Sequence, residues 1–293
     1  MKNKNIIKEI SKNSFKKKLK KAKKDISLLN NRYFLEEEVG IGGLSIVYKA
    51  SDIYSKYFNE ESNIVIKIPT KELLEKTDIA AFVYAEYVFL KKLNNDYIVK
   101  VLDFGIDKKS NIPYIVLEYI EGKLLSDYSI AQMDMIFKNT IFKILHQSLN
   151  YIHSKNIVHA DITPNNILVK DKKVIIFDFG ISQNIINDKN FTLEYKKIKA
   201  FNPKYCAPEV LEGEKPTIES DIFSFACVMY EIYTCSSLFN ENSLELKKNI
   251  NKNINLNKIP FLLKNWFKNA LNTNPKKRSM DIYMLSLVKS YNF

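Results

Sequence analysis

Three oxygen-bearing side chains in the middle of the chain have the spacing of a group-transfer site. Asn166 follows Asp161 by five residues, and Asp178 follows it by seventeen. A carboxylate beside a hydroxyl can accept its proton, and carboxylates and amide oxygens can hold Mg²⁺. Transfer of a phosphoryl group needs both functions and little covalent chemistry from the protein. These residue types could therefore supply a proton acceptor and ligands for Mg²⁺ between phosphates.

A glycine-rich stretch and a strand lysine upstream are suited to hold those phosphates. Glycines let a hairpin backbone approach phosphate oxygens, because no Cβ stands in the way. The expected nucleotide contacts from this stretch are Val39, Gly40, Ile41, Gly42, Gly43 and Val47. Lys67 lies in the apolar run 64–68, where an unpaired ammonium would be costly. Glu86 follows nineteen residues later, among apolar residues at helical spacing, and we expect it to pair with Lys67.

In this order, the residues resemble the active site of the eukaryotic-type protein kinase family, in its serine/threonine-like form. The resemblance rests on His-Ala-Asp at 159–161, Asp-Phe-Gly at 178–180 and Ala-Pro-Glu at 207–209, together with the glycine-rich stretch and the lysine strand. A glycine-rich string alone is a weak signal, because it also occurs in dinucleotide-binding turns. The resemblance implies ATP and Mg²⁺ as cofactors, with Mn²⁺ as an alternative metal. It assigns catalytic roles to Asp161, Lys67, Asn166 and Glu86, and metal binding to Asn166 and Asp178.

The resemblance also implies an α+β, two-lobed protein-kinase-like fold. A small β-rich N-lobe would carry the helix called αC, and a larger C-lobe would be helical. We expect a lysine-rich extension at residues 1–30 and a kinase domain at 31–293, with the N-lobe at 31–118, the hinge at 118–122 and the C-lobe at 123–293. The adenine pocket would be completed by Val65, Leu117, Glu118, Ile120 and Leu168.

Periodicity and turn residues predict the elements of both lobes. In the N-lobe we expect a hairpin at 33–50, strands at 64–69, 98–104 and 113–118, and the αC region at 71–93. In the C-lobe the apolar spacing predicts helices at 132–155, 219–233 and 261–271. Residues 240–258 are polar and rich in Asn and Lys, and we expect a loose or shortened insert there.

Two tertiary contacts follow from the resemblance. His159 is expected to pack against Phe179 rather than to take part in the chemistry. The chain has only two arginines, and one of them, Arg278, is expected to pair with Glu209. A planar guanidinium suits such a two-pronged buried pair better than an ammonium does.

Composition fits a single kinase-type domain. The 293 residues leave no room for a second large domain, and 46% of them are hydrophobic. No apolar run is long enough to span a membrane, and the first residues are too rich in lysine for a secretory signal. The three cysteines are Cys206, Cys227 and Cys235; their odd number and spacing predict neither a disulfide scaffold nor a zinc site. We expect a cytoplasmic protein with no transmembrane segment.

The positive charge is concentrated in a leader, residues 1–24. It contains eleven lysines and one acidic residue, Glu9, and so carries +10 of the chain's net +12. Such a run can attach to an anionic membrane, to nucleic acid or to an acidic protein. The alternative is a solvated leader with no partner, in a chain that is rich in lysine throughout.

Four positions depart from the family pattern. The usual arginine before the catalytic aspartate is Ala160, the usual lysine two residues after it is Thr163, the third loop glycine is Ser45, and Phe201-Asn202 replaces Gly-Thr. Arginine is the side chain best shaped to receive a phosphate. Without this arginine, a phosphate on Thr192 or Tyr195 has no evident receptor. We therefore expect the protein to be active without phosphorylation of either residue.

Two functions of different classes remain open. The first is an active protein kinase that transfers the γ-phosphoryl group of ATP to Ser or Thr hydroxyls of a protein substrate. The second is a pseudokinase that binds nucleotide as a scaffold or regulator, which Thr163, Ser45 and Val65 support. A small-molecule phosphotransferase is disfavoured by Ala-Pro-Glu at 207–209, which belongs to enzymes that dock a protein segment.

Overall fold

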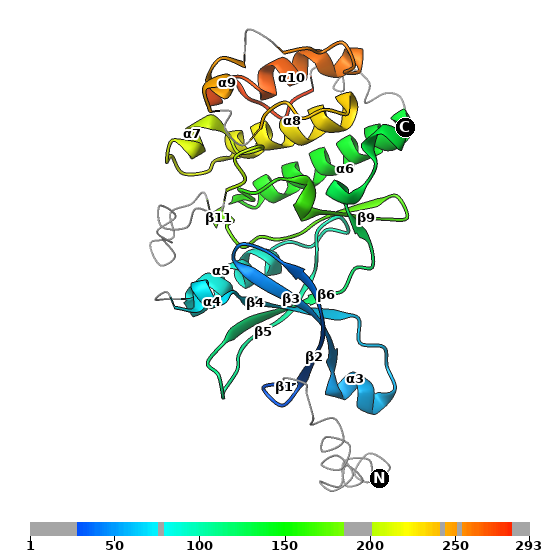
Figure 1. Ribbon diagram of the computed structural model, residues 1–293, viewed down its shortest axis with the longest axis vertical. Helices are drawn as coiled ribbons and strands as arrows, with labels where there is room; N and C mark the ends of the chain where they lie inside the picture. The colour runs from blue at the N-terminus through cyan, green and yellow to red at the C-terminus, as the bar shows by residue number, and fades with distance from the viewer. Residues whose placement is uncertain (1–27, 76–78, 185–200, 241–243, 251–253, 283–293) are drawn as a thin grey trace, which may run out of the picture.

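A six-stranded antiparallel sheet forms the smaller of two lobes in the computed structural model (Figure 1). The structure describes residues 28–75, 79–184, 201–240, 244–250 and 254–282. The sheet order is β1-β2-β3-β4-β6-β5, with bounds Leu28–Leu29, Tyr33–Ile41, Ser45–Asp52, Ile64–Pro69, Pro113–Glu118 and Val101–Ile106 in that order. The predicted hairpin and the strand 64–69 are confirmed, whereas the strand expected from residue 98 begins at Val101.

Three helices accompany this sheet. α3 (Ile53–Phe58) lies between β3 and β4, and α4 (Lys71–Leu74) and α5 (Ile79–Lys91) follow β4. The region 71–93, expected as one helical region, therefore contains two helices. α5 packs against β5 and β6 with a buried face that includes Phe82, Val83, Phe89 and Leu90. This packing places Glu86 of α5 within hydrogen-bonding distance of Lys67 on β4.

Three residues of the predicted lysine-rich extension, which was expected to run to residue 30, contact the small lobe. Leu28 and Leu29 pair with β2. The backbone N of Asn30 donates to Asp107 Oδ1 (2.8 Å), and its Nδ2 donates to Tyr114 Oη (3.0 Å). The domain bounds themselves remain a prediction.

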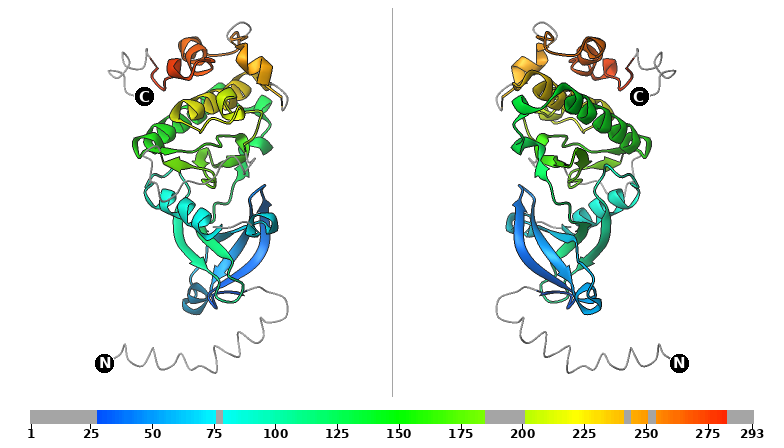
Figure 2. Two further views of the ribbon diagram at one scale, coloured as in Figure 1. Left: turned by 90° about the vertical axis from the view of Figure 1, so that its left-hand side faces the viewer. Right: turned by 90° about the vertical axis from the view of Figure 1, so that its right-hand side faces the viewer.

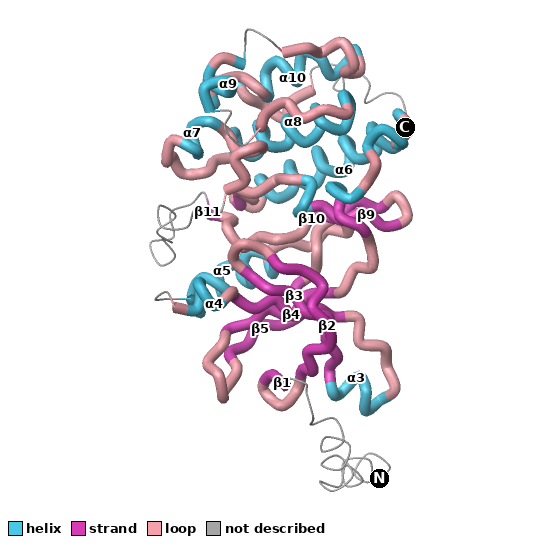
Figure 3. The backbone as a smooth tube through the Cα atoms, in the orientation of Figure 1, coloured by secondary structure: helices cyan, strands magenta, loops and turns pink. Residues whose placement is uncertain are grey.

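The larger lobe is helical, as Figure 3 shows by colour. Its helices are α6 (Met135–Ser154), α7 (Pro208–Leu211), α8 (Ile218–Thr234), α9 (Leu244–Lys248) and α10 (Lys264–Ala270). Figure 2 shows α6 and α8 side by side, with α10 beyond them. The predictions at 132–155 and 219–233 are confirmed, and 261–271 contains a 3₁₀ turn, Phe261–Leu263, followed by α10.

Local sequence sets the ends of the two long helices. Asp134 caps α6 by accepting a hydrogen bond from Phe137 N (2.6 Å). Thr217 and Ser220 form a reciprocal capping box at the start of α8. α8 is buried along nearly its whole length, and Phe223 and Phe225 are completely buried. Both α6 and α10 pack against it.

Short antiparallel strand pairs flank the segments that contain Asp161, Asn166 and Asp178. β9 (Ile167–Lys170) pairs with β10 (Lys173–Ile176) and with β7 (Lys123–Leu124). β8 (Ile157–Val158) pairs with β11 (Gln183–Asn184). These pairs bracket the loop before Asn166 and the turn at 178–180. Asp161, Asn166 and Asp178, which were predicted to act in the reaction, therefore lie in short segments between paired strands.

The polar stretch 240–258 is more ordered than expected where the structure describes it. It contains α9, and Lys247 on that helix is completely buried. Composition suggested a loose insert because Asn and Lys are usually solvated, but contacts made by this lysine outweigh that tendency. Within the described ranges, no helix has the length and apolar character needed to cross a membrane.

Candidate active site

Lys67 is held between two carboxylates from different elements. From β4, its Nζ donates to Glu86 Oε1 (2.7 Å) and Oε2 (2.9 Å) on α5, and to Asp178 Oδ1 (2.6 Å). The expected pairing of Lys67 with Glu86 is confirmed. Burial opposes the ammonium, but Asp178 and Glu86 outweigh it and raise the pKa of Lys67. The site therefore keeps a permanent cation, although Lys67 and Glu86 are both buried.

The two carboxylates respond differently to this arrangement. Burial raises the pKa of Glu86, with Lys67 opposing it. Burial also acts to raise the pKa of Asp178, but the charge of Lys67 and its hydrogen bond outweigh that effect and lower it. Asp178 thus stays ionised in the site, as a cation ligand must.

Asn166 hydrogen-bonds Asp161, five residues earlier in the chain. Its Nδ2 donates to the backbone O (2.9 Å) and the side-chain Oδ2 (2.7 Å) of Asp161. Burial and the nearby charge of Asp178 raise the pKa of Asp161 to about 7, against the hydrogen bond from Asn166. A base with a pKa near neutrality is matched to accepting a proton from a hydroxyl.

Asp221 holds the backbone that carries Asp161. From α8, its carboxylate accepts hydrogen bonds from His159 N (2.8 Å) and Ala160 N (2.8 Å), and His153 Nε2 lies 2.9 Å away. Ala160 has a positive φ of 70°, which these bonds maintain. Sequence reasoning did not single out His153. Its place in the last turn of the predicted helix 132–155, on the apolar face, was the available signal.

His159 has the structural role that was expected of it. Its ring lies 4.6 Å from that of Phe179, centroid to centroid, and both residues are completely buried. Burial lowers the pKa of His159. A neutral ring packed on Phe179 fixes the turn that presents Asp178.

The oxygen atoms near Lys67 fit a Mg²⁺ site. Asn166 uses its Nδ2 on Asp161, so its Oδ1 remains available, and Asp178 uses only Oδ1 on Lys67 and Gly180 N, so its Oδ2 remains available. Mg²⁺ is commonly held by one or two such oxygens together with phosphates and waters. Among the described residues there is no group of three His, Cys, Asp or Glu side chains for a metal, so substrate phosphates would have to complete the coordination.

A cavity of about 200 Å³ joins these groups. Six of the predicted site residues line it: Gly42, Gly43, Lys67, Glu86, Asp161 and Asp178. It also takes in Ser45, Phe82, Val83 and Gly180, which sequence reasoning did not name as site residues. A Cβ at position 180 would lie 3.2 Å from both Asp178 Oδ1 and Lys67 Nζ, so a side chain there would press on the pair that they form.

The other predicted nucleotide contacts are not among the residues that line this cavity. Gly40 and Ile41 end β2, Val47 is on β3, and Val65 pairs with Leu117 across β4 and β6. Val39 is exposed on β2, Glu118 ends β6 and accepts a bond from Lys100 N (2.8 Å), Ile120 follows it, and Leu168 is on β9. Their contacts with the nucleotide therefore remain predictions.

The segment after the site is anchored on the large lobe. Arg278 donates to Glu209 Oε1 (2.5 Å) and Oε2 (2.9 Å), which confirms the predicted two-pronged pair. Tyr205 Oη donates to Glu231 Oε2 (2.7 Å) on α8. Two of the positions that depart from the family pattern lie nearby. Thr163 is buried, and Asn202 Oδ1 accepts a hydrogen bond from Lys204 N (3.0 Å). Among the described residues, no side-chain hydrogen bond joins either of them to Asp161. Thr192 and Tyr195 lie outside the described residues.

Comparison with known proteins agrees with this geometry. The chain matches the family described as protein kinase domain over residues 33–290. It is 34% identical over 212 residues to a probable serine/threonine-protein kinase of Clostridium acetobutylicum, covering 71% of this chain and 31% of that protein. It is 31% identical over 263 residues to another of Clostridium perfringens, covering 86% and 37%.

A named relative shows the same partial match. The serine/threonine-protein kinase PknB of Mycolicibacterium smegmatis is 31% identical over 211 residues, covering 70% of this chain and 33% of that protein. The chain thus spans about a third of the length of the curated relatives it matches. The family match covers nearly all of the described residues, and the paired Lys67 and Glu86 are present in the fold. The chain belongs to the protein kinase domain family.

Proposed function

We propose that this chain is a serine/threonine protein kinase that transfers the γ-phosphoryl group of ATP to a protein hydroxyl. The observation that carries the proposal is the joint placement of Asp161, Asp178 and the Lys67–Glu86 pair around one cavity. The curated relatives are named as serine/threonine kinases, and Pro164 keeps the proline of that class. It belongs to the eukaryotic-type branch but lacks the arginine before Asp161.

Each residue has a separable task in this reaction. Lys67, held by Glu86, binds the α- and β-phosphates. Asp178 and Asn166 hold Mg²⁺ through their available oxygens, and the bound metal neutralises charge that develops on the phosphates. Asp161 orients the acceptor hydroxyl and takes its proton through Oδ1, while Asn166 occupies Oδ2.

The direct test is incubation with labelled ATP, Mg²⁺ and generic protein substrates, followed by phosphoamino-acid analysis. We expect label on Ser or Thr that depends on the metal, with Mn²⁺ as a substitute. Label on neither residue, in a protein that binds ATP with Mg²⁺, would contradict the proposal.

A nucleotide-binding scaffold is the second candidate, and one observation favours it. Thr163 is buried where the family pattern has a lysine, so Lys67 is the one cation that lines the cavity among the described residues. Catalysis of phosphoryl transfer is largely electrostatic, so a missing cation lowers the rate. Thr163→Lys should raise turnover in a weak kinase, and should leave a scaffold inactive.

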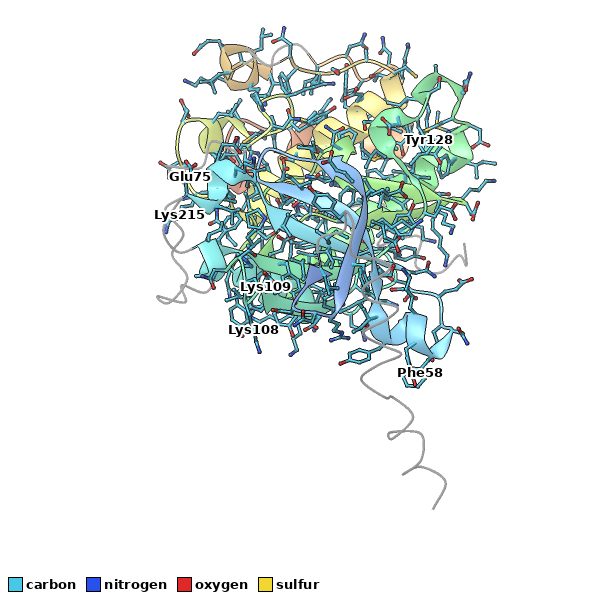
Figure 4. All side chains as sticks on the ribbon, turned by 60° about the horizontal axis from the view of Figure 1, so that its bottom comes forward. Phe58, Glu75, Lys108, Lys109, Tyr128 and Lys215 are labelled. Carbon is cyan, nitrogen blue, oxygen red and sulfur yellow. The ribbon has the colours of Figure 1, made fainter. Side chains whose placement is uncertain are left out.

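We also propose that the leader, residues 1–24, binds an anionic surface away from the active site. The described chain begins at Leu28 on the outer end of the small lobe, where Figure 4 shows Phe58, Lys108 and Lys109. Deleting residues 1–24 should leave ATP turnover on a small peptide intact and weaken binding to anionic vesicles, nucleic acid or acidic protein. Such binding should fall steeply with salt, because exposed charges are screened within about 8 Å at physiological ionic strength.

A further inference from the structure

Lys247 on α9 is a buried cation that the catalytic site does not use. Its side chain is completely buried, and Nζ donates to the backbone oxygens of Pro203 (2.6 Å) and Cys206 (2.5 Å). The ammonium also lies over two rings, 4.9 Å from the centroid of Phe239 and 5.7 Å from that of Phe223. Within the part of the chain that the structure describes, it forms no ion pair with a carboxylate. Burying such a group is costly, so its contacts must compensate for lost hydration.

Both carbonyls belong to one turn, which we call the docking turn, residues 202–206. The turn closes through Cys206 N donating to Asn202 O (2.9 Å). Two side chains of the turn, those of Tyr205 and Lys204, donate hydrogen bonds to Glu231 on α8. Lys247 differs from these anchors because it binds the backbone of the turn and therefore sets its shape.

The docking turn lies directly before Ala-Pro-Glu at 207–209, in the part of a kinase expected to meet the protein substrate. A phosphate on the preceding segment would need a cation to order this region. Ala160 offers none, and the two arginines of the chain are occupied: Arg32 binds Asp52, and Arg278 binds Glu209. Lys247 supplies a cation to the turn without any phosphate.

We propose that Lys247 is a positioning residue that holds the docking turn in the shape needed to receive a protein substrate, whether or not the preceding segment is phosphorylated. The proposal rests on the proposed kinase function. Lys247 contacts no residue of the cavity, so its effect should appear in the use of the protein substrate and not in the use of ATP.

The test is Lys247→Met, compared with Lys248→Met. Methionine fills similar space against Phe223 and Phe239 but cannot donate to the two carbonyls, so we expect a folded protein. The KM for a protein substrate should rise about tenfold, because two backbone acceptors lose their donor. The KM for ATP and the slow hydrolysis of ATP without acceptor should stay within about twofold.

Lys248 is the matched control. It is the next residue of the same helix, is exposed, and binds Glu212 (2.6 Å) outside the docking turn. Lys248→Met should change neither the KM for protein substrate nor hydrogen exchange. Peptides that cover residues 201–209 should exchange faster in Lys247→Met than in the wild type, while those that cover α8 should be unchanged. Phosphatase treatment of the wild type should leave the rate within about threefold.

Each outcome decides between the proposal and its alternatives. Unchanged exchange and unchanged KM in Lys247→Met would overturn it, and so would an equal loss of ATP hydrolysis and substrate phosphorylation together with a lower melting temperature, which is the mark of a merely structural residue. A large rate loss on phosphatase treatment would also overturn it. If the wild type binds ATP but labels no protein, the kinase proposal fails, and the exchange measurement still decides whether Lys247 holds the turn. If Lys247→Met does not fold, Lys247→Gln takes its place, because it removes the positive charge and shortens the side chain while keeping an amide NH2.

Discussion

Asp178 and Asp161 are the same residue type on one cavity, and they have opposite electrostatic surroundings. Asp178 bonds Lys67 at 2.6 Å, which lowers its pKa despite burial, whereas Asp161 is bonded only by the neutral amide of Asn166, and burial raises its pKa to about 7. Asp178, which is expected to face the nucleotide, therefore stays ionised at neutral pH. Asp161, which is expected to face the acceptor hydroxyl, can exchange a proton near neutral pH. Lys67 contributes to the difference because it donates a hydrogen bond to Asp178, whereas at Asp161 burial and the charge of Asp178 outweigh its effect.

The largest expected effect on turnover comes from replacing Asp161, the carboxylate expected to face the acceptor hydroxyl. Asp161→Asn should lower turnover at least ~10³-fold while ATP affinity changes little, because this group acts on the hydroxyl and not on the nucleotide. Steady-state kinetics and calorimetric titration with MgATP measure both quantities. Equal turnover in the variant would refute the assignment of Asp161 as the base.

The converse test replaces the nucleotide-side carboxylate. Asp178→Ala should weaken Mg²⁺-dependent ATP binding by about 100-fold or more, and Asn166→Ala should weaken it less, because a neutral amide contributes less to a cation site. Calorimetric titrations with and without Mg²⁺ provide the comparison. An unchanged metal dependence in both variants would show that the metal is held elsewhere.

The pH dependence separates the two aspartates without mutation. Asp161 must be ionised to accept a proton, and its pKa is about 7 in the free protein. The value of kcat/KM for ATP should therefore fall about tenfold per pH unit below 7 and level off above it, since this quantity reports the free enzyme. Asp178, whose pKa is lowered, should contribute no step in this range. A flat profile between pH 5.5 and about 8 would mean that proton transfer to Asp161 does not limit the reaction.

Thermal stability gives the smallest expected effect. The pKa of Asp161 is higher in the folded state than the ordinary value of about 3.9, so the folded state loses stability as pH rises from about 4 to about 7 and stays penalised above that. Asp161→Asn removes this penalty and should raise the melting temperature by about 2–4 °C at pH 8. The gain should vanish near pH 4. A lower melting temperature at pH 8 would show that the carboxylate makes a stabilising contact.

Local patterns and the family resemblance together predicted much of the fold and several residues that line the cavity. The strand 64–69, the helices around α6 and α8, and the pairs of Lys67 with Glu86 and Arg278 with Glu209 were all predicted and are present. The strand and helices follow from apolar periodicity, and the Lys67–Glu86 pair from the cost of leaving a buried charge unpaired. The Arg278–Glu209 pair was implied by the resemblance.

The order of the motifs and the charged residues that need partners can be read directly from the sequence, because those properties depend on neighbours along the chain. The fold class followed from the family resemblance that this order carries. The tertiary structure decided that Lys67 also bonds Asp178, that α4 and α5 are separate helices, and that Leu28 joins the sheet. It also buried Lys247 within a stretch whose composition predicted solvent. Such contacts join residues far apart in sequence, and the balance of burial against pairing in each one depends on distances that no local pattern contains.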